Sequence, residues 1–157
     1  MAAIRRRKGY RYGETVTELR AEVQRYAAAN GHPVGVDHVP TCACGAAVGH
    51  HLTVDDEEGA AMLTCARCQA RGFVGDSEQY LPAGAQHPDL FRECVCRAQT
   101  FEVLIGAALY EGSQDVRWWY VGARCMCCGC LGVYGDWKDD GGPWETTLRP
   151  PHRGPAR

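Results

Sequence analysis

Ten cysteines give this chain of 157 residues its strongest chemical signal. They form four clusters: Cys42-Ala-Cys44, Cys65-Ala-Arg-Cys68, Cys94-Val-Cys96 and Cys125-Met-Cys127-Cys128-Gly-Cys130. The basic residues near the start are not followed by the apolar run of a secretion signal, so we expect a cytoplasmic protein with reduced thiols. Reduced cysteines in close pairs are typical of metal sites, and a disulfide framework is the alternative.

The clusters indicate an internal repeat, because C-x-C followed by C-x-x-C occurs twice. When Cys65 is placed on Cys125, Gly72–Asp76 aligns with Gly132–Asp136 without a gap. Residues 45–64 separate the first two pairs and residues 97–124 the second two, a difference of even length that keeps strand side chains on their original faces. The predicted metal ligands are Cys42, Cys44, Cys65 and Cys68 in one module, and Cys94, Cys96, Cys125 and Cys128 in the other.

This arrangement resembles the zinc-ribbon class, in which two cysteine turns flank a β-hairpin and a further strand closes the module. The closest motif is Cys125-x-x-Cys128-Gly129, which is similar to the C-x-x-C-G turn of that class, whereas the C-x-C turns depart from it. The resemblance implies a small, metal-stabilised α+β fold: two tandem β-hairpin zinc ribbons, residues 41–81 and 93–140, with one N-terminal amphipathic helix. It also implies two structural Zn²⁺ ions, although iron can use the same four thiolates.

Two cysteines of the last cluster lie outside this ligand set. Cys127 and Cys130 form another C-x-x-C, but Cys125 and Cys128 keep the register of the repeat and place Gly129 after the second ligand. We therefore expect Cys127 and Cys130 to be small, partly buried apolar residues, with a reactive thiol as the alternative.

Residues 1–40 are predicted to hold a basic arm and one helix. Thr15-Val-Thr-Glu18 has the pattern of a capping box, and the apolar residues after it follow at helical spacing. This pattern predicts an amphipathic helix over residues 16–29, which Asn30 and Gly31 end. We expect the apolar stripe of the helix to pack on one of the ribbons.

A basic arm with interleaved tyrosines precedes the helix: Arg5, Arg6, Arg7, Lys8, Tyr10, Arg11 and Tyr12. They indicate either a flexible, solvated terminus or an arm that contacts nucleic acid. At the other end, residues 141–157 are rich in Pro and Gly and are predicted to be a disordered tail. No apolar run is long enough to span a membrane, and the net charge of -2 excludes a uniformly cationic protein.

The chain contains no Walker loop, H-E-x-x-H or G-x-S-x-G motif, and four thiolates leave a metal ion no open position for substrate, so we predict that it is not an enzyme. We expect a protein-interaction module, such as a bacterial immunity or accessory protein that caps a partner. Its candidate surface is aromatic: Trp118, Trp119, Tyr120, Tyr134 and Trp137. Packing of these residues into the core is the competing interpretation. The alternative function is a nucleic-acid-binding or transcription-associated zinc ribbon that uses the basic arm.

Overall fold

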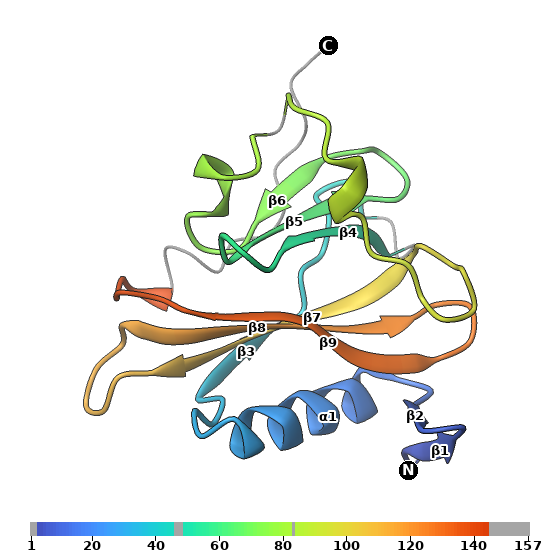
Figure 1. The fold of residues 1–157 in the computed structure, drawn as a ribbon, viewed down its shortest axis with the longest axis horizontal. Coiled ribbons are helices and arrows are strands. Elements are labelled where there is room, and N and C mark those ends of the chain that lie inside the picture. The colour runs from blue at the N-terminus through green and yellow to red at the C-terminus, as the bar shows by residue number, and fades with distance from the viewer. Residues whose placement is uncertain (1–2, 46–48, 83, 145–157) are drawn as a thin grey trace.

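The computed structural model describes residues 3–45, 49–82 and 84–144, which form a mainly antiparallel β structure with one α-helix (Figure 1). The strands are β1 (Arg5–Arg7), β2 (Tyr10–Tyr12), β3 (Val36–His38), β4 (His50–Asp55), β5 (Ala60–Cys65), β6 (Arg71–Phe73), β7 (Phe101–Leu109), β8 (Val116–Cys125) and β9 (Cys130–Lys138). The helices are α1 (Val16–Ala29) and the short 3-10 turns η1 (Ser77–Gln79) and η2 (Pro88–Leu90). The described strands form one sheet in the order β1-β2-β9-β8-β7-β4-β5-β6, with β3 paired to β7.

Each predicted cysteine module contributes three consecutive antiparallel strands. In the first, β4 pairs with β5 and β5 with β6, while in the second, β7 pairs with β8 and β8 with β9. The β4–β5 turn closes where the Gly59 N–H donates to the Asp55 carbonyl oxygen at 2.9 Å, and the Asp55 carboxylate accepts two further turn amides. A carboxylate that accepts backbone N–H groups stabilises a tight turn.

The prediction of two separate tandem ribbons is wrong, because both three-stranded units belong to one continuous sheet. His50 of β4 is the register partner of Phe101 of β7, and β3 pairs with β7 further along, from Ile105 to Ala107. The amides and carbonyls of a strand edge favour pairing with any suitable neighbour. The two hairpins therefore pair with each other at one end, and β3 adds to β7. The part of the prediction that remains is the coarser one, a small α+β protein with two cysteine clusters.

The strands form two layers, and the helix adds a third (Figure 1). One apolar cluster lies between β4–β6 and β7–β9, and its buried members include Leu52, Val54, Val103, Trp119 and Val121. A second lies between β7–β9 and α1, and its buried members include Leu19, Val23, Ala27, Leu104 and Tyr120. Strand β8 contributes to both clusters, which explains why its sequence is apolar on both faces.

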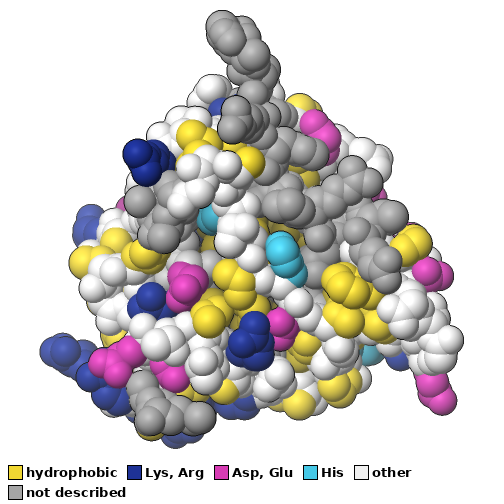
Figure 2. Space-filling view, turned by 180° about the vertical axis from the view of Figure 1, so that it is seen from behind, with side chains coloured by type: hydrophobic (Ala, Val, Ile, Leu, Met, Phe, Trp, Pro, Cys, Tyr) yellow, Lys and Arg dark blue, Asp and Glu magenta, His cyan; other side chains and the backbone are white. Residues whose placement is uncertain are grey.

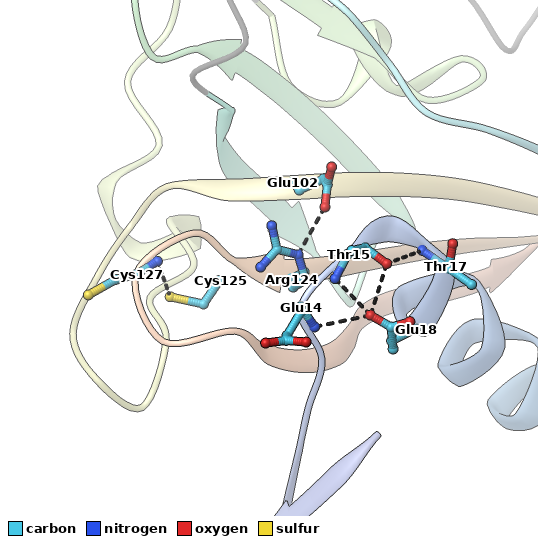
Figure 3. A network of polar contacts seen from close by, with 8 residues as sticks. All are labelled: Glu14, Thr15, Thr17, Glu18, Glu102, Arg124, Cys125 and Cys127. Carbon is cyan, nitrogen blue, oxygen red and sulfur yellow. Dashed lines mark hydrogen bonds and ion pairs between the residues drawn. The ribbon is translucent and has the colours of Figure 1, made fainter. Parts of the chain in front are cut away.

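Helix α1 confirms the sequence prediction for residues 16–29. Thr15 is the N-cap: its hydroxyl accepts the Thr17 N–H at 3.2 Å, and the Glu18 carboxylate accepts the Thr15 N–H at 2.8 Å (Figure 3). The helix also packs on a strand unit, as expected, through the apolar cluster shared with β7–β9. The Tyr26 hydroxyl donates to the Asp136 carboxylate of β9 at 2.6 Å, and this bond, with burial, raises the pKa of Tyr26 to about 12.

The basic arm is a β-hairpin rather than a flexible terminus. Lys8 and Gly9 form its turn with φ values of 52° and 84°, the left-handed geometry that a two-residue hairpin turn requires. Strand β2 then pairs with the start of β9, where Tyr12 is opposite Cys130. The Gly13 N–H extends this pairing by donating to the Gly129 carbonyl oxygen at 2.9 Å. The arm is thereby joined to the second cysteine module.

The predicted tail falls mostly outside the described residues, which end at 144. Its first residues are bound to the β7–β8 turn: the Val116 N–H donates to Gly142 at 3.0 Å, and the Trp144 N–H donates to Gln114 at 3.2 Å. Within the described part of the chain, no helix has both the length and the apolar character needed to cross a membrane.

Candidate metal centres

The first group of four cysteines lies where β4–β6 meet their connecting turns, and we name it centre 1. Cys42 and Cys44 precede β4, Cys65 ends β5, and Cys68 lies in the turn before β6. The Sγ atoms of Cys42 and Cys68 are 3.3 Å apart, and those of Cys44 and Cys65 are 3.8 Å apart. All four sulfur atoms lie within 4.8 Å of one another, close enough to bind one metal ion.

The second group, centre 2, occupies the corresponding place in β7–β9. Cys94 and Cys96 precede β7, Cys125 ends β8, and Cys128 lies in the turn before β9. The Sγ atoms of Cys94 and Cys128 are 3.5 Å apart, and those of Cys96 and Cys125 are 3.6 Å apart. The sulfur atoms of centre 2 also all lie within 4.8 Å of one another. The structure thus brings together all eight predicted ligands, in the two predicted groups.

The sulfur separations fit a metal ion. A tetrahedral zinc site with Zn–S bonds of about 2.3 Å places its ligands roughly 3.8 Å apart, and the four separations above run from 3.3 to 3.8 Å. A disulfide bond needs sulfur atoms only about 2.05 Å apart, and all ten cysteines are free. The donor set is therefore that of a four-thiolate metal site.

Backbone amides around centre 1 stabilise the thiolate form of Cys65. Burial raises the pKa of Cys65, but bonds from the Cys68 and Arg67 amides and from the Cys42 and Cys68 thiols outweigh burial and lower the pKa to about 7. A hydrogen bond that the charged form accepts lowers the pKa of an acid. Metal ions bind the thiolate, so these amides favour ligation.

In centre 2 the same kind of support is found at Cys96, whereas burial raises the pKa of Cys94 and of Cys128. The Ala98 amide and the neighbouring Cys125 thiol lower the pKa of Cys96 to about 7 against the opposing effect of burial. The Cys127 amide lies 3.4 Å from the Cys125 sulfur, and Figure 3 shows the Cys127 side chain directed away from that sulfur.

Both types of cysteine turn use a residue with positive φ. After each C-x-C pair that residue is Gly45 (φ 74°) or Arg97 (φ 75°), and after each C-x-x-C pair it is Gln69 (φ 66°) or Gly129 (φ 81°). The left-handed conformation is readily adopted by glycine but strained for other residues. Gly129 meets a second requirement, because a Cβ atom there would lie 2.6 Å from the Gly13 carbonyl oxygen.

The two cysteines outside the ligand set differ from each other. Cys130 is buried beside Tyr12, in agreement with the prediction of a small apolar residue. Cys127 is exposed, which corrects the expectation that it is partly buried. The reason is local: Cys127 lies in the turn between two ligands, and that turn directs its backbone N–H, not its side chain, at the Cys125 sulfur.

The aromatic residues predicted to bind a partner are parts of the core or its edge. Trp119 and Tyr120 are fully buried, whereas Trp118, Tyr134 and Trp137 are partly buried. Asp139 accepts the Trp119 indole N–H at 2.6 Å, and Asp136 accepts the Trp118 indole N–H at 2.9 Å. Trp118 also stacks on His32 with ring centres 4.6 Å apart. In this fold Trp119 and Tyr120 offer no surface to a partner.

Sequence reasoning did not connect centre 2 with the basic arm. A groove of about 640 Å³ lies between them, lined by Arg5, Arg6, Arg7, Lys8, Tyr10, Tyr12, Val95, Cys96 and Cys128. The basic residues and tyrosines before the helix indicated a binding surface, but only strand pairing with β9 places that surface beside the cysteines.

Comparisons with protein-family models, with curated proteins and with solved structures found no match.

Proposed function

We propose that this protein is a non-catalytic binding protein whose fold is stabilised by two structural zinc ions. The observation that carries the proposal is the pair of closed four-cysteine groups, with sulfur separations that match a tetrahedral site. Closed sites of four thiolates are typical of structural zinc, whereas catalytic zinc keeps one position for water or substrate. Each centre lies where a β-hairpin meets its turns, so a bound ion would fix the geometry of that hairpin.

We also propose that the two cysteine modules arose by duplication. The register supports this: Leu63 pairs with Gly72, and Ala123, 60 positions after Leu63, pairs with Gly132, 60 positions after Gly72. The neighbouring pairs, Thr64 with Arg71 and Arg124 with Leu131, have the same offset. The positive φ values at 69 and 129 repeat it in the cysteine turns.

A binding role is supported more by charge than by aromatic anchors. A protein partner, including the accessory or immunity role expected from the sequence, cannot use Trp119 or Tyr120, because both are buried. Among the described residues outside the groove, the large apolar side chains that are most exposed are Tyr80, Phe91 and Met126. The concentrated feature on the surface is instead the cationic hairpin beside centre 2.

The metal proposal is tested by elemental analysis of the purified chain and of two matched variants. We expect two equivalents of zinc in the native chain and in Cys127→Ser, because Cys127 is exposed and lies outside the tetrad. Cys68→Ser should retain one equivalent, since it removes a ligand of centre 1 and leaves the four cysteines of centre 2 in place. Iron in place of zinc, a single equivalent in the native chain, or loss of zinc from Cys127→Ser would each contradict the assignment.

A further inference from the structure

The groove beside centre 2 has walls of different chemistry. The β1–β2 hairpin forms one wall, while Val95, Cys96 and Cys128 of the second cysteine module form the other. The space-filling view shows Lys and Arg side chains gathered at the lower left, where the hairpin lies when Figure 1 is seen from behind (Figure 2). A volume of about 640 Å³ is within the range of sites that hold small ligands or single nucleotides.

The strand register of the hairpin places cations and aromatic rings on one face. Arg5 is opposite Tyr12 and Arg7 is opposite Tyr10. Directly opposed residues of an antiparallel pair share a face, and so do residues two positions apart on one strand. The four side chains therefore form a square in which each arginine has a tyrosine across from it. Tyr10 is 47% exposed, so its ring is open to a ligand.

The cations of the groove have no acidic partner in the described part of the chain. Five arginines elsewhere, at positions 11, 20, 25, 92 and 124, form ion pairs with carboxylates. None of these ion pairs involves Arg5, Arg6, Arg7 or Lys8, and no acidic residue is among the described residues that line the groove.

The negative charge of the zinc-loaded centre offsets only part of the positive charge of the hairpin. A zinc ion with four thiolates carries a net charge of -2, whereas the hairpin contributes four cations, Arg5, Arg6, Arg7 and Lys8. The hairpin and the loaded centre together therefore keep a net charge of +2, beside the exposed ring of Tyr10.

We propose that the groove between the β1–β2 hairpin and centre 2 binds single-stranded nucleic acid, with Arg5 and Arg7 on phosphates and Tyr10 stacked on a base. This inference rests on the proposed function only in taking the protein to be a folded, metal-loaded binding protein. Cationic grooves lined by aromatic side chains bind single strands because the cations follow the backbone and the rings accept any base. Duplex bases are already stacked on one another, so the ring of Tyr10 favours a single strand.

The test is fluorescence anisotropy of the zinc-loaded full chain with a labelled oligothymidylate of about twelve nucleotides, within the site sizes known for single-strand binders. Its affinity should fall as salt is raised, by a slope of roughly 0.7 in log K per log salt for each phosphate contacted. Arg5→Ala/Arg7→Ala should weaken binding and reduce that slope by about 1 to 1.5. Tyr10→Ala should weaken binding roughly five- to a hundredfold with the slope unchanged.

Two control variants keep residue type and exposure similar. Tyr80→Ala removes a tyrosine that is 42% exposed, close to the 47% of Tyr10, from a site outside the groove. Arg117→Ala/Lys138→Ala removes two exposed cations from the ends of β8 and β9 that lie furthest from centre 2. Both controls should bind the oligonucleotide as the native chain does.

The outcomes separate the two proposals. If the chain holds two equivalents of zinc but does not bind the oligonucleotide, the nucleic-acid site is overturned and the zinc proposal stands. If the chain holds no zinc, the zinc proposal is contradicted. Equal affinity for a duplex of the same length, or an unchanged affinity in Tyr10→Ala, shows charge attraction alone and overturns the stacking site. If polyglutamate displaces the oligonucleotide at equal charge concentration, the nucleic-acid site is overturned in favour of an acidic protein partner.

Discussion

Centres 1 and 2 have the same ligands and the same strand register but different surroundings. The hairpin of centre 1 has two strands of six residues, and that of centre 2 has strands of nine and ten. Centre 2 is also bordered by the β1–β2 hairpin, and α1 packs on strands β7–β9 of its module. Four cysteines are thus sufficient to define the turns of a hairpin, while the length of the hairpin determines how much other structure can pack on it.

Two tryptophans of the second module pack against the first. Trp119 packs on the backbone at Gly75, where a Cβ atom would lie 3.1 Å from the indole nitrogen. Trp137 packs on the β4–β5 turn in the same way, since a Cβ atom at Gly59 would lie 2.9 Å from the indole ring. The aromatic residues of the second module therefore join the two modules to each other.

Loss of a ligand should have the largest effect and should differ between the centres. Zinc binding contributes about 10–16 kcal/mol in peptide models, as much as the whole stability of a typical domain. Cys128→Ser should therefore unfold the chain, because β8 and β9 contact every layer. Cys68→Ser should disorder β4–β6 but leave α1 protected on β7–β9. Hydrogen exchange of both variants measures this, and equal loss of protection in α1 would show that the centres are equivalent.

Replacement of the two neighbouring tryptophans should give the next largest effect. Trp119→Ala should cost about 3–5 kcal/mol, the usual range for a fully buried aromatic residue. Trp118→Ala should cost about 1–3 kcal/mol, because it loses one hydrogen bond and one ring contact from a partly buried site. Denaturant unfolding with zinc content checked gives both values. A greater cost at Trp118 would mean that the helix side, not the contact with β4–β6, dominates stability.

A methyl group at Gly122 should disturb only the helix side of the second hairpin. A Cβ atom there would lie 2.2 Å from a methyl carbon of Val23 in α1. We expect Gly122→Ala to cost about 1–3 kcal/mol through this overpacking. Val23→Ala removes the clashing methyl group, so the double variant should be more stable than the sum of the two single effects indicates. Strictly additive losses would show that the helix does not contact Gly122.

The smallest expected effect is a pH dependence of stability that arises from Glu18 at the start of α1. The hydrogen bond from the Thr15 side chain, with those from the Thr15 and Glu14 amides, lowers the pKa of Glu18 below its ordinary value of 4.5 despite burial. A carboxyl group with a lowered pKa adds stability that is complete above the unfolded pKa and is lost as pH falls through the folded pKa. The gap in unfolding free energy between the native chain and Glu18→Gln should therefore be constant near neutrality and close in acid. A gap that persists at low pH would show that the carboxylate charge is not involved.

Local patterns in the sequence predicted the parts of the molecule that depend on near neighbours. The helix over residues 16–29, with Thr15 and Glu18 at its start, follows from capping and periodicity, and the eight ligands follow from spacing. The joining of the modules was missed because the pairing of His50 with Phe101, and of β3 with β7, has no local signature. Arg97 in a left-handed conformation was equally hidden, since nothing in an arginine indicates positive φ.

The hydrogen bond between Tyr26 and Asp136 joins residues separated by 110 positions. Because synthesis starts at the N-terminus, the helix is made well before the strand on which it packs. At about 5–20 residues per second, a ribosome needs on the order of ten seconds to extend the chain from one to the other. The cysteines of centre 1 all emerge within that interval, so the first metal site can assemble on the nascent chain while the helix still lacks the surface that it covers. The apolar face of α1 therefore stays uncovered until β9 has been made.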